Sequence, residues 1–279
     1  MIGTENMKQD EIDSCNAAFW DELCGSQIAR ELDLKDNSPG SLKKFDDWFL
    51  EFYPYLHRYL PFAEMRGKRV LEVGLGYGSV SQKIIDAGAQ FHGLDIAAEP
   101  VAMALHRCEL AGVTDAVALQ GNILKPPFEK NTFDWVVAIG CLHHTGNLPK
   151  AIEAVHRLLK VGGQALIMVY SAASYRQLAR APLTTMKRKL SGPFAPYRGH
   201  TAEEAERRAY DINVDGTAAP QTEFVTKSEL RELCEAFSKV RIDTENIGAE
   251  GPLAKIPRAV LCKWLGPYVG LDLYCQLVK

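Results

Sequence analysis

Nine residues in the N-terminal half constrain the fold of this chain most strongly. They read Val70-Leu-Glu-Val-Gly-Leu-Gly-Tyr-Gly78, an apolar run that ends in three glycines at alternate positions. A short apolar run bounded by glycines is typical of a buried β-strand that leads into a sharp turn. Glycine lets the backbone turn sharply and lets a ligand lie against the main chain, where a Cβ atom would collide. The segment therefore predicts a strand, a tight turn over Gly74, Gly76 and Gly78, and a ligand beside that turn.

The residues around the glycines indicate what kind of ligand the turn suits. A dinucleotide-binding turn has the pattern G-x-G-x-x-G and directs a pyrophosphate to the N-terminus of the following helix. Here Ser79 stands at the third glycine of that pattern, and Glu72 places a carboxylate two residues before the turn. A carboxylate repels phosphates and attracts cations, most strongly in a cleft shielded from water. The turn is therefore expected to hold a ligand that carries positive charge.

Strand-like and helix-like spacings of apolar residues alternate along the chain after this turn. Short apolar runs predict strands at residues 69–73, 91–94, 116–119, 135–139, 165–170, 239–242 and 272–278. Between the first of them, apolar residues recur every three or four positions, and Gly88 and Gly112 end two such helical segments. This order predicts an α/β fold with a mainly parallel sheet and helices on both faces. Ligands of such sheets bind at the carboxyl ends of the strands.

The composition favours one enlarged, folded domain in a reducing compartment. The chain has 279 residues, of which 47% are hydrophobic and 24% charged, enough to bury a full core. Its net charge of -3 argues against a general nucleic-acid binder. Seven scattered cysteines without a C-x-x-C pair favour free thiols in a cytoplasmic protein, and no cluster of ligands indicates a metal site. The sequence shows no secretory signal and no run of about 18 apolar residues that could span a membrane.

The glycine segment and the hundred residues after it resemble, in order, the motifs of the class I S-adenosylmethionine-dependent methyltransferases. The resemblance runs from about Lys68 to Tyr170 and looks closest to the small-molecule branch typified by the C-methyltransferases of quinone biosynthesis. Besides the glycine segment, it is carried by residues 90–96 (Gln-Phe-His-Gly-Leu-Asp-Ile), 121–123 (Gly-Asn-Ile), 133–144 and 158–163 (Leu-Leu-Lys-Val-Gly-Gly). It implies a Rossmann-like, seven-stranded, mostly parallel sheet in which strand seven lies antiparallel beside strand five.

The resemblance also implies roles for residues around the expected cofactor, S-adenosylmethionine. Asp95 ends the second strand, where the family's acidic residue holds both ribose hydroxyls, and a carboxylate can accept two hydrogen bonds from a diol. Asn122 and Ile123 fall where the family contacts the adenine amino group and ring. Many relatives have Asp in place of Asn122, whose carbonyl oxygen can still accept. The complete predicted cofactor-binding set is Glu72, Gly74, Gly76, Gly78, Asp95, Ile96, Asn122, Ile123 and Cys141.

Two histidines after the fourth strand are the predicted catalytic residues. Methyl transfer is an in-line displacement at a carbon activated by positive sulfur, so alignment and exclusion of water supply much of the acceleration. A base is needed only if the acceptor must lose a proton, and an imidazole suits that step near neutral pH. His144 is the preferred candidate and His143 the second. The alternative is structural, since one of two adjacent histidines usually points into the packed interior.

Substrate choice is expected to lie outside the common core. We expect an N-terminal helical lid at residues 1–62, the cofactor-binding core at 63–170, an insertion at 171–225 and the C-terminal part of the sheet at 226–279. The lid is expected to hold a helix over 19–32 and an aromatic-rich helix over 42–60. The insertion exceeds an ordinary connection, and its first half is basic. It could attract an anionic or carrier-bound acceptor or a membrane face, or form the solvated side of a lid helix.

These observations predict an enzyme that moves a methyl group from S-adenosylmethionine to a small-molecule acceptor, with O- or C-methylation favoured over N-methylation. The candidate substrate residues are Tyr53, Tyr55, Tyr197 and Arg198, with core packing as the alternative for the aromatic rings. A nicotinamide-dependent oxidoreductase is the leading enzyme alternative, and Glu72 and Ser79 disfavour it. A non-catalytic module that has kept the cofactor fold is the alternative from another class.

Overall fold

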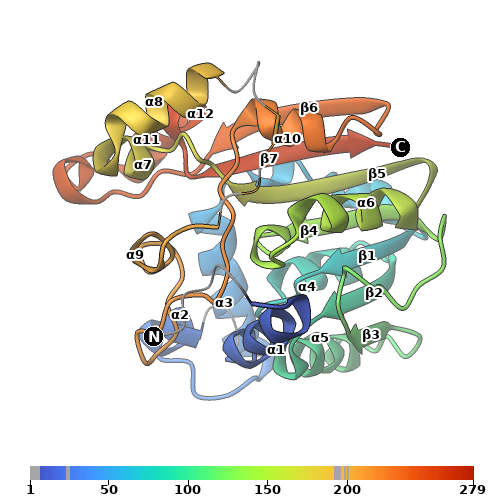
Figure 1. Cartoon of the computed structure of the whole chain (residues 1–279). Coiled ribbons are helices and arrows are strands. Elements are labelled where there is room, and N and C mark those ends of the chain that lie inside the picture. The colour runs from blue at the N-terminus through green and yellow to red at the C-terminus, as the bar shows by residue number, and fades with distance from the viewer. Residues whose placement is uncertain (1–6, 23–25, 192–195, 198, 200) are drawn as a thin grey trace.

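The computed structural model describes residues 7–22, 26–191, 196–197, 199 and 201–279, and a seven-stranded sheet forms its centre (Figure 1). The strands are β1 (Arg69–Val73), β2 (Gln90–Asp95), β3 (Val117–Gln120), β4 (Phe133–Ile139), β5 (Leu159–Tyr170), β6 (Lys239–Glu245) and β7 (Asp272–Val278). Their order is β3-β2-β1-β4-β5-β7-β6. The pairs from β3 to β5 are parallel, whereas β7 is antiparallel to both β5 and β6. The predicted Rossmann-like, mostly parallel sheet is confirmed, with strand seven inserted beside strand five.

Helices cover both faces of the sheet, as the spacing predicts. One apolar cluster joins the sheet to α6 (Leu148–Leu158) and α10 (Lys227–Leu233), and a second joins it to α4 (Ser79–Asp86) and α5 (Ala98–Leu110). Along β4, Val136 belongs to the first cluster and Val137 to the second. This alternation is expected for a strand that is buried on both faces.

The N-terminal helices differ from the expected ones. The structure has α1 (Gln9–Trp20), α2 (Ser26–Glu31), α3 (Pro39–Phe52) and a 3₁₀ turn, η2 (Leu56–Arg58). The prediction of one helix over 19–32 was wrong, because α1 buries only Ile12 and Asn16 and so shows little apolar periodicity. The predicted helix over 42–60 begins earlier and ends earlier. Ser38 caps α3 and Pro39 occupies its first turn, both common at a helix start.

The segments around the last strands are made of short helices. The region between β5 and β6 holds α7 (Tyr175–Arg180), α8 (Pro182–Ser191), α9 (Glu204–Arg207) and α10, and a capping box of Thr226 and Glu229 opens α10. Between β6 and β7 lie η6 (Gly251–Leu253), α11 (Arg258–Trp264) and α12 (Gly266–Val269). Two further 3₁₀ turns are η3 (Phe62–Met65) and η4 (Leu142–His144). No helix in the described part of the chain combines the length and apolarity that a membrane crossing needs.

Candidate functional site

A cavity lies at the carboxyl ends of β1, β2, β3 and β4, where the predicted ligand site falls. It encloses about 800 Å³ of space, its open mouth included. Seven of the nine predicted cofactor-binding residues line it: Gly74, Gly76, Asp95, Ile96, Asn122, Ile123 and Cys141. Because the parallel strands end at one edge of the sheet, residues from four separate loops meet here.

The glycine turn has the left-handed backbone that its sequence predicts. Gly74, Gly76 and Gly78 have φ angles of 77°, 51° and 79°. A Cβ atom on Gly74 would lie 2.5 Å from Cβ of Cys141, so the close approach of the loop after β4 requires glycine there. A Cβ atom on Gly78 would lie 2.7 Å from Cδ of Arg107. Gly78 is absent from the cavity wall and accommodates a buried arginine rather than a ligand.

Asp95 presents a fixed carboxylate at the end of β2. Its Oδ2 accepts a hydrogen bond from the amide of Leu75 at 2.7 Å, and its Oδ1 accepts one from the amide of Ala97 at 2.9 Å. Burial raises the pKa of Asp95, and the backbone amides oppose that rise by stabilising the charged form. Each oxygen retains a lone pair for a further donor. The carboxylate can therefore accept two more hydrogen bonds from a ligand such as a diol.

The loops after β3 and β4 supply the opposite part of the wall. Oδ1 of Asn122 accepts a hydrogen bond from the amide of Leu124 at 2.8 Å, beside the apolar side chain of Ile123. The Sγ atom of Cys141 donates to the carbonyl of Val73 at 3.0 Å. Burial raises the pKa of the Cys141 thiol, so this group lines the cavity in its neutral form.

Glu72 lies behind the cavity rather than in its wall. Its carboxyl accepts a hydrogen bond from Oγ of Ser81 at 2.5 Å. Burial raises the pKa of Glu72 to about 8, against the opposing effects of Ser81 and Arg107. A carboxyl with this pKa is largely protonated at pH 7, so the direct attraction of a cationic ligand that the sequence predicts has no support in this geometry.

A buried ion pair behind the glycine turn was missed by sequence reasoning. Arg107 of α5 is fully buried and donates to both oxygens of Asp46 on α3, at 2.8 and 2.9 Å. Its Nε donates to the carbonyl of Tyr77 within the turn at 2.9 Å, and Oγ of Ser79 donates to Asp46 at 2.5 Å. In the sequence, the only sign of this ion pair was a charged residue, Arg107, beside Cys108 on the apolar side of a predicted helix. These hydrogen bonds hold the glycine turn in place on the side that faces away from the cavity.

The two predicted catalytic histidines have different surroundings. His144 lines the cavity, and its Nδ1 donates to the carbonyl of Gln221 at 2.6 Å. Its Nε2 lies 3.7 Å from Oδ2 of Asp211, and both atoms are buried. His143 is fully buried outside the wall, and neither of its ring nitrogens has a hydrogen-bond partner in the described structure. Its ring contacts those of His144 and Tyr170 in tilted arrangements, with centroids 4.1 Å from each.

Burial favours the uncharged form of both His144 and Asp211. It lowers the pKa of His144 and raises the pKa of Asp211. Each shift favours a neutral group, although the attraction between the two charged forms opposes both. Because Nδ1 must carry a hydrogen to donate to the Gln221 carbonyl, Nε2 is the nitrogen that titrates. At 3.7 Å Nε2 and Oδ2 make no hydrogen bond, so the two buried groups act on each other through charge alone.

Helix α1 closes the cavity on the side of His144; the sequence predicted a helical lid within residues 1–62 but not this helix. Asp13, Asn16 and Trp20 line the wall at a spacing of three and four residues, on one helical face. Nδ2 of Asn16 donates to the carbonyl of His144 at 2.7 Å, and its Oδ1 is buried without a partner in the described structure. The rings of Trp20 and His144 lie 4.9 Å apart. This side of the cavity offers an aromatic face and hydrogen-bond acceptors.

The three predicted substrate residues that the structure describes do not line the cavity. Tyr53 and Tyr55 belong to the apolar cluster beneath the sheet, where the Tyr55 ring lies 5.5 Å from that of Tyr274. Neither ring lines the cavity wall, because both pack against the core, the alternative given above. The hydroxyl of Tyr197 donates to Glu223, away from the wall. Arg198 lies outside the described residues.

The basic residues of the insertion that the structure describes face other protein groups or solvent. Arg176 pairs with Glu250 at 2.8 Å, and Arg188 pairs with Glu229 at 3.2 Å. None of the described basic residues of the insertion lines the cavity. No group of three side chains suited to a metal ion occurs among the residues that the structure describes.

Comparison with known proteins agrees with this geometry. Residues 71–167 match the family described as a methyltransferase domain. Phosphoethanolamine N-methyltransferase 2 of Caenorhabditis elegans is 30% identical over 112 residues, which are 37% of this chain and 24% of that protein. A ubiquinone biosynthesis O-methyltransferase of Burkholderia ambifaria is 32% identical over 146 residues, 47% of this chain and 62% of that protein. The chain thus spans only part of the length of these relatives.

A solved structure shares the fold. Haemonchus contortus phosphoethanolamine N-methyltransferase 2, in complex with phosphomonomethylethanolamine and S-adenosylhomocysteine, aligns with a TM-score of 0.53 and 19% identity. The alignment covers 82% of this chain and 52% of that one. The sheet order, the glycine turn and the matched segment define a class I S-adenosylmethionine-dependent methyltransferase domain. Within that class, the sequence relatives of this chain are methyltransferases of small molecules.

Proposed function

We propose that this protein transfers a methyl group from S-adenosylmethionine to a small-molecule acceptor. The observation that carries the proposal is the convergence of seven predicted cofactor residues, from four loops, on one cavity. In this proposal Asp95 binds the ribose hydroxyls, Asn122 and Ile123 hold the adenine, and the bare backbone at Gly74 and Gly76 receives the methionine part. The wall formed by α1 and the loop after β4 then faces the methyl group and the acceptor.

The acceptor side of the cavity supports catalysis by alignment and exclusion of water. Trp20 and Asn16 on α1 cover this side, which limits the entry of water during an in-line displacement. His144 is the proposed base, acting through Nε2, and O- or C-methylation is favoured because such acceptors lose a proton. Nε2 is buried beside Asp211. A base role therefore requires the acceptor, or a proton relay through Asp211, to reach that edge of the ring.

The proposal is tested by calorimetric titration of the whole chain with S-adenosylmethionine, S-adenosylhomocysteine and NADH. We expect the first two to bind in the micromolar range and NADH not to bind; the reverse result would replace the proposal with an oxidoreductase. Asp95→Ala should weaken cofactor binding by about 1.5 to 3 kcal/mol, because two hydrogen bonds to a charged group are lost. Asp115→Ala, an exposed control, should leave binding unchanged. Formation of S-adenosylhomocysteine with added acceptors separates an enzyme from a cofactor-sensing module.

A further inference from the structure

Helix α8 exposes its apolar side and buries its polar side. Leu183, Met186 and Leu190 are 85%, 45% and 68% exposed, and their spacing places them on one face. The opposite face is anchored by polar contacts. Buried Thr185 donates from Oγ1 to the carbonyl of Gln177 at 3.0 Å, and Arg188 donates from Nη2 to the carbonyl of Phe224 at 2.7 Å. These contacts fix the rotation of the helix, so its apolar ridge points to solvent.

A second exposed ridge runs along α11 and α12. Val260, Trp264 and Tyr268 recur at intervals of four residues and are 45%, 65% and 73% exposed. The inner side of α11 is held by Leu261 and Cys262, both buried. Tryptophan and tyrosine combine an apolar ring with a polar group, which suits them to a boundary between apolar and aqueous surroundings.

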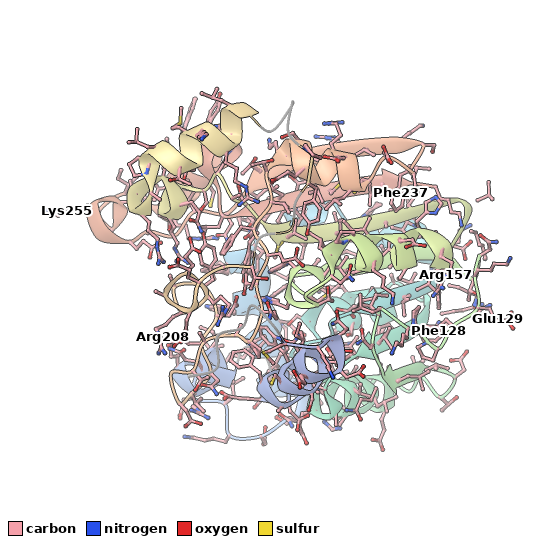
Figure 2. All side chains as sticks on the ribbon, viewed as in Figure 1. Phe128, Glu129, Arg157, Arg208, Phe237 and Lys255 are labelled. Carbon is pink, nitrogen blue, oxygen red and sulfur yellow. The ribbon has the colours of Figure 1, made fainter. Side chains whose placement is uncertain are left out.

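The two ridges lie at the same end of the molecule. Figure 1 shows α7, α8, α11 and α12 gathered at the upper left, away from α1 and the cavity that α1 covers. Figure 2 shows the side chain of Lys255 at the outer edge of this end, in the segment that leads into α11. We call the exposed side chains of α8, α11 and α12, with Lys255, the basic apolar surface.

The charges of this surface have one sign. Residues 180–191 and 251–271 contain no aspartate or glutamate, although the whole chain has a net charge of -3. Their exposed basic residues are Arg180, Lys187, Lys189, Lys255 and Lys263. Nζ of Lys263 lies 5.5 Å from the centre of the Trp264 ring, so a cation and an aromatic side chain share one place on the surface.

We infer that the basic apolar surface docks the protein on an anionic lipid bilayer. Exposed leucines and aromatic rings can enter the boundary between headgroups and acyl chains, while the flanking lysines remain at the level of the phosphates. Neither segment contains an acid that would offset the attraction to anionic lipids, and Glu250, just before the second segment, is paired with Arg176. Another protein would also cover apolar side chains, but the uniform positive charge of both ridges selects a partner whose whole surface is negative. The inference stands independently of the proposed methyl transfer, because none of these residues lines the cavity.

The test is sedimentation of the full chain with large vesicles of phosphatidylcholine, alone or with 30 mol% phosphatidylglycerol, on the order of 0.1 M salt. We expect partition into the anionic vesicles at least tenfold above that into the neutral ones, falling as salt is raised. Leu183→Ser/Leu190→Ser and Trp264→Ser/Tyr268→Ser should each reduce partition about tenfold. Val161→Ser is the matched control: Val161 is 87% exposed near the start of β5, so its loss should leave partition unchanged.

Two further measurements keep the test decisive. Unfolding curves of each variant should superimpose on that of the natural chain, because only exposed side chains change. Light scattering after gel filtration should give the same mass for the natural chain and the Leu183→Ser/Leu190→Ser variant. Equal partition into both kinds of vesicle, no partition into either, or a dimer that the variant disrupts would overturn the inference, and the last result would assign the surface to a second copy of the chain.

Discussion

The guanidinium of Arg107 donates to both carboxylate oxygens of Asp46, 61 residues away in the chain, at a point where both side chains are buried. The pair joins α5 to α3, and Arg107 also donates to the carbonyl of Tyr77 in the glycine turn. The shape of the turn therefore depends on an ion pair that contains no residue of the glycine motif. Gly78 is required because any side chain there would displace Arg107.

Breaking this pair should destabilise the protein strongly. Asp46→Ala leaves the Arg107 charge buried without its partner, and such a change costs about 3 to 5 kcal/mol. Asp47→Ala is the control on the same helix, because Asp47 forms an exposed pair with Lys43 that contributes about 1 kcal/mol or less. Urea unfolding of both variants measures the difference. Equal stability of the two variants would show that Arg107 finds other partners, and a loss of cofactor affinity in Asp46→Ala alone would link the pair to the turn.

The raised pKa of Glu72 makes stability depend on pH. The folded protein holds the Glu72 proton up to a pKa of about 8, whereas the unfolded chain releases it near the ordinary value of 4.5. Between these values the folded state binds more protons, so stability falls as pH rises through this window. Glu72→Gln should reduce that fall by an amount on the order of a few kcal/mol between pH 5 and 8. Because the pKa of Asp272 is also raised, to about 7, the stability of the Glu72→Gln variant still falls in part as the pH rises.

Urea unfolding at pH 5 and at pH 8 measures this effect. Glu153→Gln on the exposed side of α6 serves as the control and should leave the difference between the two pH values unchanged. A Glu72→Gln variant that loses as much stability as the natural chain would show that Glu72 ionises normally in the folded protein.

The core of the fold could be predicted because the sequence patterns of its strands and turns agree with the way these elements pack. The strand that begins at Arg69 and ends at Val73 is apolar and is followed by glycine, and the structure has these bounds. The strand expected at 165–170 begins earlier, at Leu159, because β5 continues through a register shift against β4 that the glycines at 162 and 163 had obscured. The seven cavity residues could be predicted for the same reason, since each lies at the end of a strand or in the short loop just after it.

The rest of the site depends on contacts between distant segments. Asp211 reaches His144 from the insertion, and no pattern around it distinguishes it from a solvated acid. Trp20 and Asn16 come from a helix that buries few apolar residues, so its position over the cavity leaves little periodicity in the sequence. Tyr55 failed as a substrate residue because its ring has a place in the core against Tyr274.

Gly74 should be less replaceable than another glycine with the same backbone. Gly74 and Gly112 have φ angles of 77° and 70°, so alanine at either site adopts an unfavourable left-handed conformation. Only at Gly74 would the added Cβ meet another atom, Cβ of Cys141 at 2.5 Å, because nothing lies within 4 Å at Gly112. Gly112→Ala should cost about 1 kcal/mol and keep cofactor binding, whereas Gly74→Ala should cost more and lose binding. Thermal unfolding and cofactor titration compare the two variants. Equal losses of stability and of cofactor affinity in both would show that the contact with Cys141 does not require glycine at position 74.

Asp211 should tune the proton affinity of His144. Asp211→Asn keeps the size of the side chain but removes the carboxylate whose negative charge raises the pKa of His144. We expect cofactor affinity to be unchanged, turnover to fall by about tenfold or more, and the pH dependence of turnover to move. A fall in turnover at all pH values with an unmoved profile would indicate that Asp211 only supports the insertion.

The two histidines should separate a catalytic role from a packing role. His144 lines the cavity and has an Asp211 carboxyl beside its titrating nitrogen, whereas His143 is sealed behind it with two unpartnered nitrogens. His144→Ala should lower turnover by about a hundredfold or more while cofactor affinity is kept, which is the signature of a lost base. His143→Leu should keep turnover and lose little stability, because it removes buried polar atoms that make no hydrogen bond. Cofactor titration, steady-state kinetics and urea unfolding of both variants are required together. If His143→Leu abolished turnover in a stable protein while His144→Ala retained it, the base would be His143 and not His144. If His144→Ala failed to fold, the hydrogen bond from His144 to the Gln221 carbonyl would be needed for stability. His144→Gln, which keeps a hydrogen-bonding side chain, would then test whether His144 is the base.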